Sequence, residues 1–293
     1  MTKRLCRQIG FGKPLLFWGF SLAFGLSRRT SMCSALSSHI LSLLYNQYYF
    51  IFAILPILLF FCGSVMEDDP IIFVLRYGSY KHYFTSKWRS LGVLCSGLWL
   101  GQITILFVTG AGLSVIKQGW DNFSGSSLLK DIAPLLVKSF PGAWVAVFCA
   151  AVYMLMGYWL IALLTLWLGH FLQRQKAIKV LLALYILTIL SIKLPIMSRP
   201  PFCYLTGINH WVLLLHNLTA GWRFPLTVIV TLLFVVTVIC SIQGGWRSAA
   251  HHHRISKGLP AYYRHILFSA SNFLVLAILR VGLVFWRSSN RWS

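Results

Sequence analysis

Acidic residues are the scarcest feature of this 293-residue sequence, in which five Asp and Glu accompany 26 Lys and Arg. Charged residues of both signs make up only 11% of the chain, 58% of the residues are hydrophobic, and the mean hydropathy is +0.73. Soluble proteins carry about 25% charged residues, so the composition excludes an ordinary soluble fold. We predict an all-α integral membrane protein.

The formal charge of +21 is also typical of nucleic-acid-binding proteins. Such proteins are polar and carry their basic residues on an exposed domain, and no such domain is visible here. We therefore expect no nucleic-acid partner. The positive charge instead predicts a fixed membrane topology and binding to the anionic headgroups of membrane lipids.

Motifs for common chemistry are missing from the chain. There is no Gly-x-x-x-x-Gly-Lys-Ser/Thr for binding ATP by a P-loop, and no His-Glu-x-x-His, Gly-x-Ser-x-Gly or Ser-His-Asp set. The seven scattered cysteines form no Cys-x-x-Cys pair, which indicates neither a zinc site nor a disulfide framework. We expect no catalytic residue, no metal and no cofactor in this chain, which is not expected to be an enzyme.

Three polar clusters need separate interpretation. The histidines at 251–253 with His265 have no acidic residue or cysteine close in sequence, which favours a solvated cytoplasmic loop over a metal site. The acidic run at 67–69 is interpreted as helix capping and pairing with nearby basic residues. His210 and His216 would lie on the outer side, in an interfacial helix with polar ends or against a substrate.

Apolar runs of bilayer-spanning length divide the chain. Because a hydrocarbon core of about 30 Å needs roughly 20 helical residues, we count spans by that length. We predict six membrane-spanning helices, at residues 10–27, 47–66, 91–116, 143–170, 179–195 and 224–243. Residues 244–293 would hold a cytoplasmic loop and a seventh apolar run at 266–286, which Arg280 interrupts and which is a span, a re-entrant piece or a surface helix. Residues 1–293 would form a single transmembrane domain.

Connections rich in Lys and Arg alternate along the chain with connections that contain fewer of them. They number four in residues 1–13, four in 70–90, three in 171–179 and four in 243–265, whereas the alternate connections are poorer or partly neutralised. Cytoplasmic connections are the ones enriched in Lys and Arg. The sequence therefore predicts a multi-pass protein of the cell membrane with a cytoplasmic N-terminus.

Residues 70–89 have the pattern of an amphipathic helix between two spans. Asp69 is a favourable N-cap, and Pro70 suits the first helical position. Helical spacing places five aromatic residues on one face, namely Phe73, Tyr77, Tyr80, Phe84 and Trp88. The opposite face carries the polar residues Ser79, His82, Ser86 and Arg89, and Gly78 weakens the centre of the helix. We predict a cytoplasmic helix lying at the membrane surface.

The run Arg76-Tyr77-Gly78-Ser79, followed by Lys81, Tyr83 and Lys87, resembles the first cytoplasmic loop of small type-2 ABC-transporter permeases of Gram-positive bacteria, most closely over residues 48–116. The resemblance implies a permease subunit of a bacteriocin, antibiotic or peptide export or immunity system. Its partners would be a separate ATPase, which binds the ATP and Mg, and an identical or homologous second permease half. The ATPase-coupling residues that it implies are Arg76, Tyr77, Gly78, Ser79, Lys81, Tyr83 and Lys87.

Polar side chains inside the predicted spans are candidates for a substrate pathway, in particular Gln102, Tyr153, Tyr158 and Thr231. Intramembrane polar groups more often hold helices together than line a pathway. Two other functions stay open, namely a non-transporting membrane immunity or scaffold protein and a polytopic intramembrane enzyme.

Overall fold

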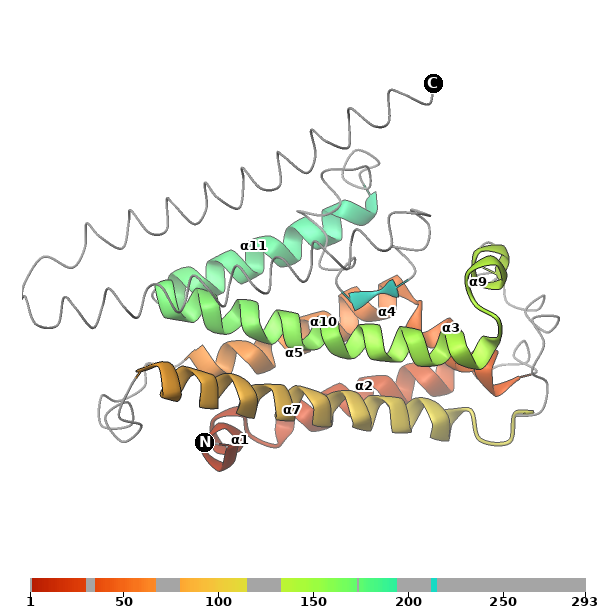
Figure 1. The fold of residues 1–293 in the computed structure, drawn as a ribbon, viewed down its shortest axis with the longest axis horizontal. Helices are drawn as coiled ribbons and strands as arrows, with labels where there is room; N and C mark the ends of the chain where they lie inside the picture. The colour runs from red at the N-terminus through yellow and green to blue at the C-terminus, as the bar shows by residue number, and fades with distance from the viewer. Residues whose placement is uncertain are drawn as a thin grey trace, which may run out of the picture.

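The computed structural model describes residues 2–29, 35–66, 80–114, 133–172, 174–193 and 212–214. These residues are mostly helical and form no strand among themselves (Figure 1). A mainly helical fold is therefore confirmed for the described part. The predicted spans at 224–243 and 266–286 lie outside the described residues, as do 67–79 and Thr231.

The first half of the described chain alternates short and long helices. They are α1 (Thr2–Ile9), α2 (Gly12–Ser27), α3 (Leu36–Leu44), α4 (Gln47–Tyr49), the π-helix η1 (Phe50–Ile54), α5 (Leu55–Gly63) and the 3-10 helix η2 (Ser64–Met66). The four elements from α4 to η2 follow one another without a gap, so they form one apolar rod across residues 47–66.

The second half contains the longest helices. They are α7 (Tyr80–Thr109), α9 (Ala133–Ser139), α10 (Ala143–Phe171) and α11 (Arg174–Lys193). Figure 1 shows α7 and α10 running the length of the bundle in opposite directions, with α2 against α7 and α11 against α10.

Three helical segments of the described part are long and apolar enough to cross a membrane, namely Gln47–Met66, His82–Thr109 and Ala143–Gly169. They coincide with three of the predicted spans, although the third predicted span is wrong at both ends. Its helix begins at Tyr80 rather than at residue 91, and it ends at Thr109 rather than at 116. Gly112 explains the earlier end, because its φ of +87° is incompatible with a continuing α-helix.

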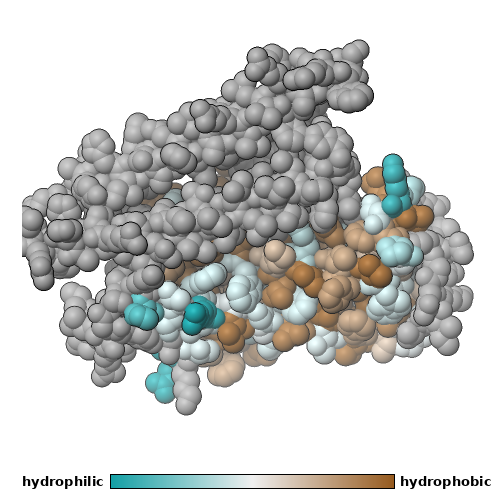
Figure 2. All heavy atoms as spheres, in the orientation of Figure 1, coloured by the Kyte–Doolittle hydropathy of each residue, from teal (hydrophilic) through white to brown (hydrophobic). Residues whose placement is uncertain are grey.

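Large apolar side chains cover the outside of the described helices. Phe60 and Phe148 are 65% and 69% exposed, and similar side chains follow one another along α2 and α11. In Figure 2 hydrophobic residues gather in the middle of the visible described surface, and strongly hydrophilic residues lie towards its two ends. An apolar waist of this kind is expected of a surface that faces lipid.

Basic residues lie mainly at one end of the bundle, where α7 begins and α10 ends. Arg4 and Arg7 of α1 lie at this end, because Thr2 Oγ1 is 3.2 Å from Ser90 Oγ near the start of α7. Arg89 and the start of α11 add further basic residues here. None of the five acidic residues of the sequence falls within the described part, so the described helices carry positive charge alone.

The predicted outer connection at residues 28–46 contains α3, which packs against α7 and α10. Every residue of α3 except Ser42 is buried. The helix tolerates buried serines because their hydroxyls bond to its own backbone, as Ser38 Oγ does to the Ala35 carbonyl at 2.8 Å. Nine residues are too few for a span, so counting spans by length missed this part of the core.

Candidate functional site

The rod that begins at α4 starts with two departures from α-helical geometry. Asn46 ends the turn after α3, and its Oδ1 accepts the N–H of Tyr49 at 2.9 Å, which caps the new helix. In η1, the N–H of Leu55 then bonds to the carbonyl of Phe50, five residues back. Pro56 follows immediately and has no N–H to donate, so a wide turn here accommodates its ring. Tyr49 is positioned between the cap and the π-helix.

A continuous chain of hydrogen bonds passes through Tyr49. The hydroxyl of Tyr158 donates to Gln102 Oε1 at 2.7 Å, and Gln102 Nε2 donates to Tyr49 Oη at 3.4 Å. The hydroxyl of Tyr49 donates to Ser21 Oγ at 2.7 Å, and the hydroxyl of Ser21 donates to the Phe17 carbonyl at 2.9 Å. We call these four side chains the polar chain. It joins α10, α7, α4 and α2.

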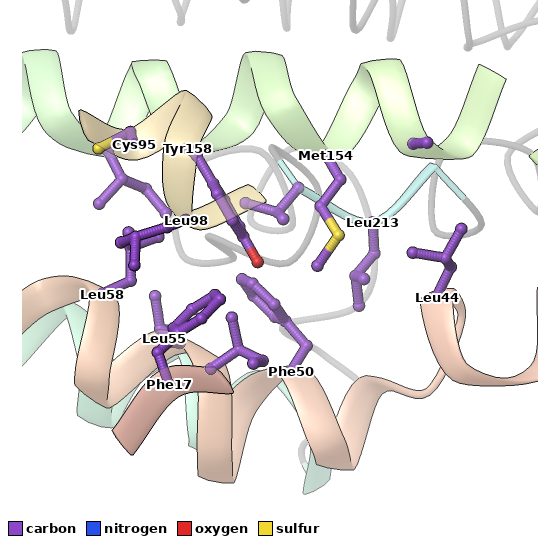
Figure 3. Close-up of a cluster of buried hydrophobic side chains, with 14 of the residues drawn as sticks. Phe17, Leu44, Phe50, Leu55, Leu58, Cys95, Leu98, Met154, Tyr158 and Leu213 are labelled. Carbon is purple, nitrogen blue, oxygen red and sulfur yellow. The ribbon is translucent and has the colours of Figure 1, made fainter. Parts of the chain in front are cut away.

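Apolar rings enclose the polar chain. Ser21, Gln102 and Tyr158 are fully buried. The ring of Phe24 stacks on Tyr49 at a centroid distance of 4.3 Å, and that of Phe17 meets Tyr158 edge to face at 6.2 Å. Figure 3 shows the Tyr158 hydroxyl pointing from α10 into the cluster that contains Phe17 and Phe50.

The polar chain can hold four helices in one arrangement. In an apolar environment a polar group without a partner is costly, so each of these groups favours the packing that supplies its partner. The members are neutral hydroxyls and one carboxamide, which suit hydrogen bonding rather than proton transfer at neutral pH. Within the described ranges, no three His, Cys, Asp or Glu side chains lie close enough together to bind a metal ion.

The structure joins two of the candidate pathway residues, since Gln102 and Tyr158 bond to each other. The half-buried Tyr153 packs against the apolar core. Ser21 and Tyr49 were not among the residues predicted from the sequence. Both could have been noticed in the sequence, since they are polar residues within or at the edge of predicted spans. Their neighbours in the sequence, however, do not indicate that the two side chains meet.

Small residues let α2 and α7 approach closely beside the polar chain. A Cβ atom added to Gly25 would lie 2.7 Å from Thr109 Oγ1, and one added to Gly101 would overlap the indole of Trp18. Trp18 is itself fixed, since its Nε1 donates to the Leu98 carbonyl at 3.2 Å. Glycine is therefore required at both crossings.

The predicted coupling residues fall partly on α7. Arg76, Tyr77, Gly78 and Ser79 lie outside the described residues, and the side chain of Lys81 is also outside them. Residues 80–89 form the first turns of α7 and continue into the span, rather than forming a separate surface helix.

The two described side chains of the aromatic face expected for residues 70–89 pack against the rest of the bundle. Phe84 is buried, and Trp88 meets Trp159 of α10 edge to face at 6.3 Å. Tyr83 and Lys87 are also buried, and Lys87 Nζ lies 5.8 Å from the centre of the Tyr83 ring. The start of α7 is thus attached to the bundle.

No family model, curated protein or solved structure matches this chain. The likeness to ABC permeases therefore rests on the motif that begins at Arg76 and on the hydropathy pattern around it.

Proposed function

We propose that this chain is the transmembrane permease subunit of an ABC exporter, which moves a peptide, bacteriocin or antibiotic-like substrate with a separately encoded ATPase. One observation supports the proposal most strongly. The described part of the segment expected to contact the ATPase, from Tyr80 on, forms the first turns of α7, and α7 also carries Gln102 at the centre of the polar chain. A push at the start of α7 would therefore reach the helices that Gln102 connects.

The proposed orientation puts the start of α7 in the cytoplasm. The basic residues of α1, Arg89 and the start of α11 gather at this end, and the opposite end has fewer, among them Arg28 and Arg29. This asymmetry supports a cytoplasmic N-terminus.

The polar chain suggests how closure of the ATPases would open a path. The hydrogen bond between Tyr158 and Gln102 exists only while α7 and α10 are packed together. If α7 moves, these groups lose their partners and become available to a polar substrate, together with the nearby face of α10 that carries Tyr153. A second permease half would complete the path, while ATP and Mg stay on the ATPase.

The proposal predicts a charge-sensitive contact with a nucleotide-binding partner. We expect the wild-type chain, purified by affinity from its native membrane, to retain a second polypeptide that a photoreactive ATP analogue labels. The double variant Arg76→Glu and Lys81→Glu should lose most of that polypeptide and its ATP hydrolysis, because two charges at the contact reverse.

The variant Lys117→Glu and Lys130→Glu is the matched control, because the same charge change lies in a connection predicted to be outside the cell. It should keep the ATP-labelled partner. Absence of any labelled partner from the wild-type preparation would refute the transporter proposal.

A non-transporting immunity or scaffold protein is the second candidate. The polar chain favours this second candidate in one respect, since the hydrogen bonds of the polar chain are all formed within the protein. Such a protein would bind its partner without an ATPase. The same purification would then retain a partner that the ATP analogue does not label.

Topology gives a further test of the orientation. Single cysteines introduced at Ser126 and Thr206, in a variant without the native cysteines, should react with a membrane-impermeant maleimide in intact cells. Those at Ser86 and Ser256 should react only after the cells are opened. Labelling at Ser86 from outside would place the start of α7 on the wrong side for an ATPase.

A further inference from the structure

A second buried polar contact lies at the end of the bundle opposite to the start of α7. His39 of α3 is fully buried, and its Nε2 lies 3.2 Å from Thr109 Oγ1 at the end of α7. The Thr109 hydroxyl donates to the Leu106 carbonyl at 3.1 Å, so its oxygen accepts the Nε2–H of a neutral His39. The other ring nitrogen, Nδ1, is buried and has no hydrogen-bond partner among the described residues.

Close packing surrounds this contact. A Cβ added to Gly110 would lie 3.0 Å from His39 Cδ2, and one added to Gly25 of α2 would lie 2.7 Å from Thr109 Oγ1. Backbone bonds also tie the region together, since Leu36 N–H donates to the Ser114 carbonyl at 3.1 Å. We call this meeting of α2, α3 and α7 the His39 joint.

Positive charge lies beside the joint. Arg29, just after α2, donates from its guanidinium to the Ala111 carbonyl at 2.6 Å. Burial, and secondly the charge of Arg29, lower the pKa of His39 below its ordinary value of 6.5.

The other titratable groups on neighbouring described elements are guanidinium, phenol and thiol groups rather than carboxylates. Arg28 follows α2, Tyr45 follows α3, and α10 carries Cys149 and Tyr153. The last two turns of α7 contain no titratable residue, and no carboxylate belongs to the described part.

We propose that His39 is a proton-operated latch, which fastens α3 to α7 when the ring is neutral and releases it when the ring is protonated. Protonation adds an N–H at Nδ1, where the described structure supplies no acceptor, and places a second cation near Arg29. The joint would then open at acidic pH. This latch does not depend on the proposed export function, because it is described by the packing of the chain itself.

The direction of the pH effect follows from proton binding. Below pH 6.5 an opened joint binds a proton more readily than the closed joint, since His39 has the lower pKa when closed. Closure is therefore fully favoured above pH 6.5 and weakens as the pH falls, by up to about tenfold per pH unit for one proton.

Hydrogen–deuterium exchange of the full chain in lipid nanodiscs tests the latch. After correction for intrinsic exchange rates, peptides covering residues 36–46 and 106–114 should exchange severalfold faster at pH 5.0 than at pH 7.5, and by at most about thirtyfold. A peptide within residues 150–165 should not change. Absence of a rise at 36–46 in the wild type would overturn the proposal.

Three variants distinguish the latch from a general effect of acid. His39→Gln can still donate to Thr109 but cannot become charged, so it should lose the rise, whereas His82→Gln, a change of an exposed histidine at the opposite end of α7, should keep it. An unchanged rise in His39→Gln would refute the latch. Thr109→Val removes the acceptor of the His39 N–H and should give fast exchange at both pH values. Slow exchange at pH 7.5 in this variant would contradict the proposal. This test does not require that His39→Gln folds.

Discussion

Replacing Gly25 by alanine will destabilise the bundle by about 1–3 kcal/mol, because the new methyl group has no room against α7. Its Cβ would meet Oγ1, Cγ2 and Cβ of Thr109 at 2.7, 2.8 and 3.0 Å. Rotation of the threonine side chain moves the first two atoms but not its Cβ, so α2 itself would have to shift. Equilibrium unfolding in mixed detergent micelles would measure the loss.

Gly19 provides the matched control on the same helix. A Cβ added there would have no heavy atom of another described element within 4 Å, so Gly19→Ala should leave the stability unchanged or raise it by up to about 1 kcal/mol. On α7, Gly101→Ala and Gly97→Ala form a second pair of the same kind, because only the former meets Trp18. Equal effects within each pair would contradict the close crossing of α2 and α7.

Removal of Gln102 from the polar chain is the second change with a large expected effect. Gln102→Leu deletes the acceptor of the Tyr158 hydroxyl and leaves it buried without that partner. We expect a loss of about 1–2 kcal/mol in the free energy of unfolding. Tyr49 is less affected, since its hydroxyl still donates to Ser21.

A double-mutant cycle separates this effect from lost packing. Tyr158→Phe removes the stranded hydroxyl, so the double variant with Gln102→Leu should be more stable than Gln102→Leu alone. Thr104→Val is the control on α7, because Thr104 is exposed and bonds only to the Leu100 carbonyl of its own helix among the contacts described. Additive losses from the two core changes would show that the Gln102 and Tyr158 side chains are not coupled.

Three of the six predicted spans match described helices that are long and apolar enough to cross a membrane, and the ends of one of the three were predicted wrongly. The run at 47–66 needed no correction, since its apolar residues are continuous. The start of α7 was misjudged because residues 70–89 were interpreted as a surface helix separate from the span that follows. Lys87 is instead buried near Tyr83 in a helix that continues into the apolar run, and local charge cannot reveal such packing.

The polar chain shows a different limit of sequence reasoning. Gln102 and Tyr158 could be selected singly because polar groups inside spans are unusual. Their pairing depends on how α7 and α10 lie against each other, and 56 residues separate them in the chain. The position of Tyr49 depends further on the π-helix before Pro56, which hydropathy does not register. The missed residues are thus those placed by tertiary packing.

The lack of carboxylates in the described helices alters how this bundle would respond to acid denaturation. Most proteins lose stability in acid because carboxylates that are paired in the native state become protonated. The described helices contain no such group, and between pH 5 and 8 histidine is the side chain that ordinarily titrates. Acid sensitivity, which is normally spread over many surface pairs, would here be concentrated at one buried imidazole.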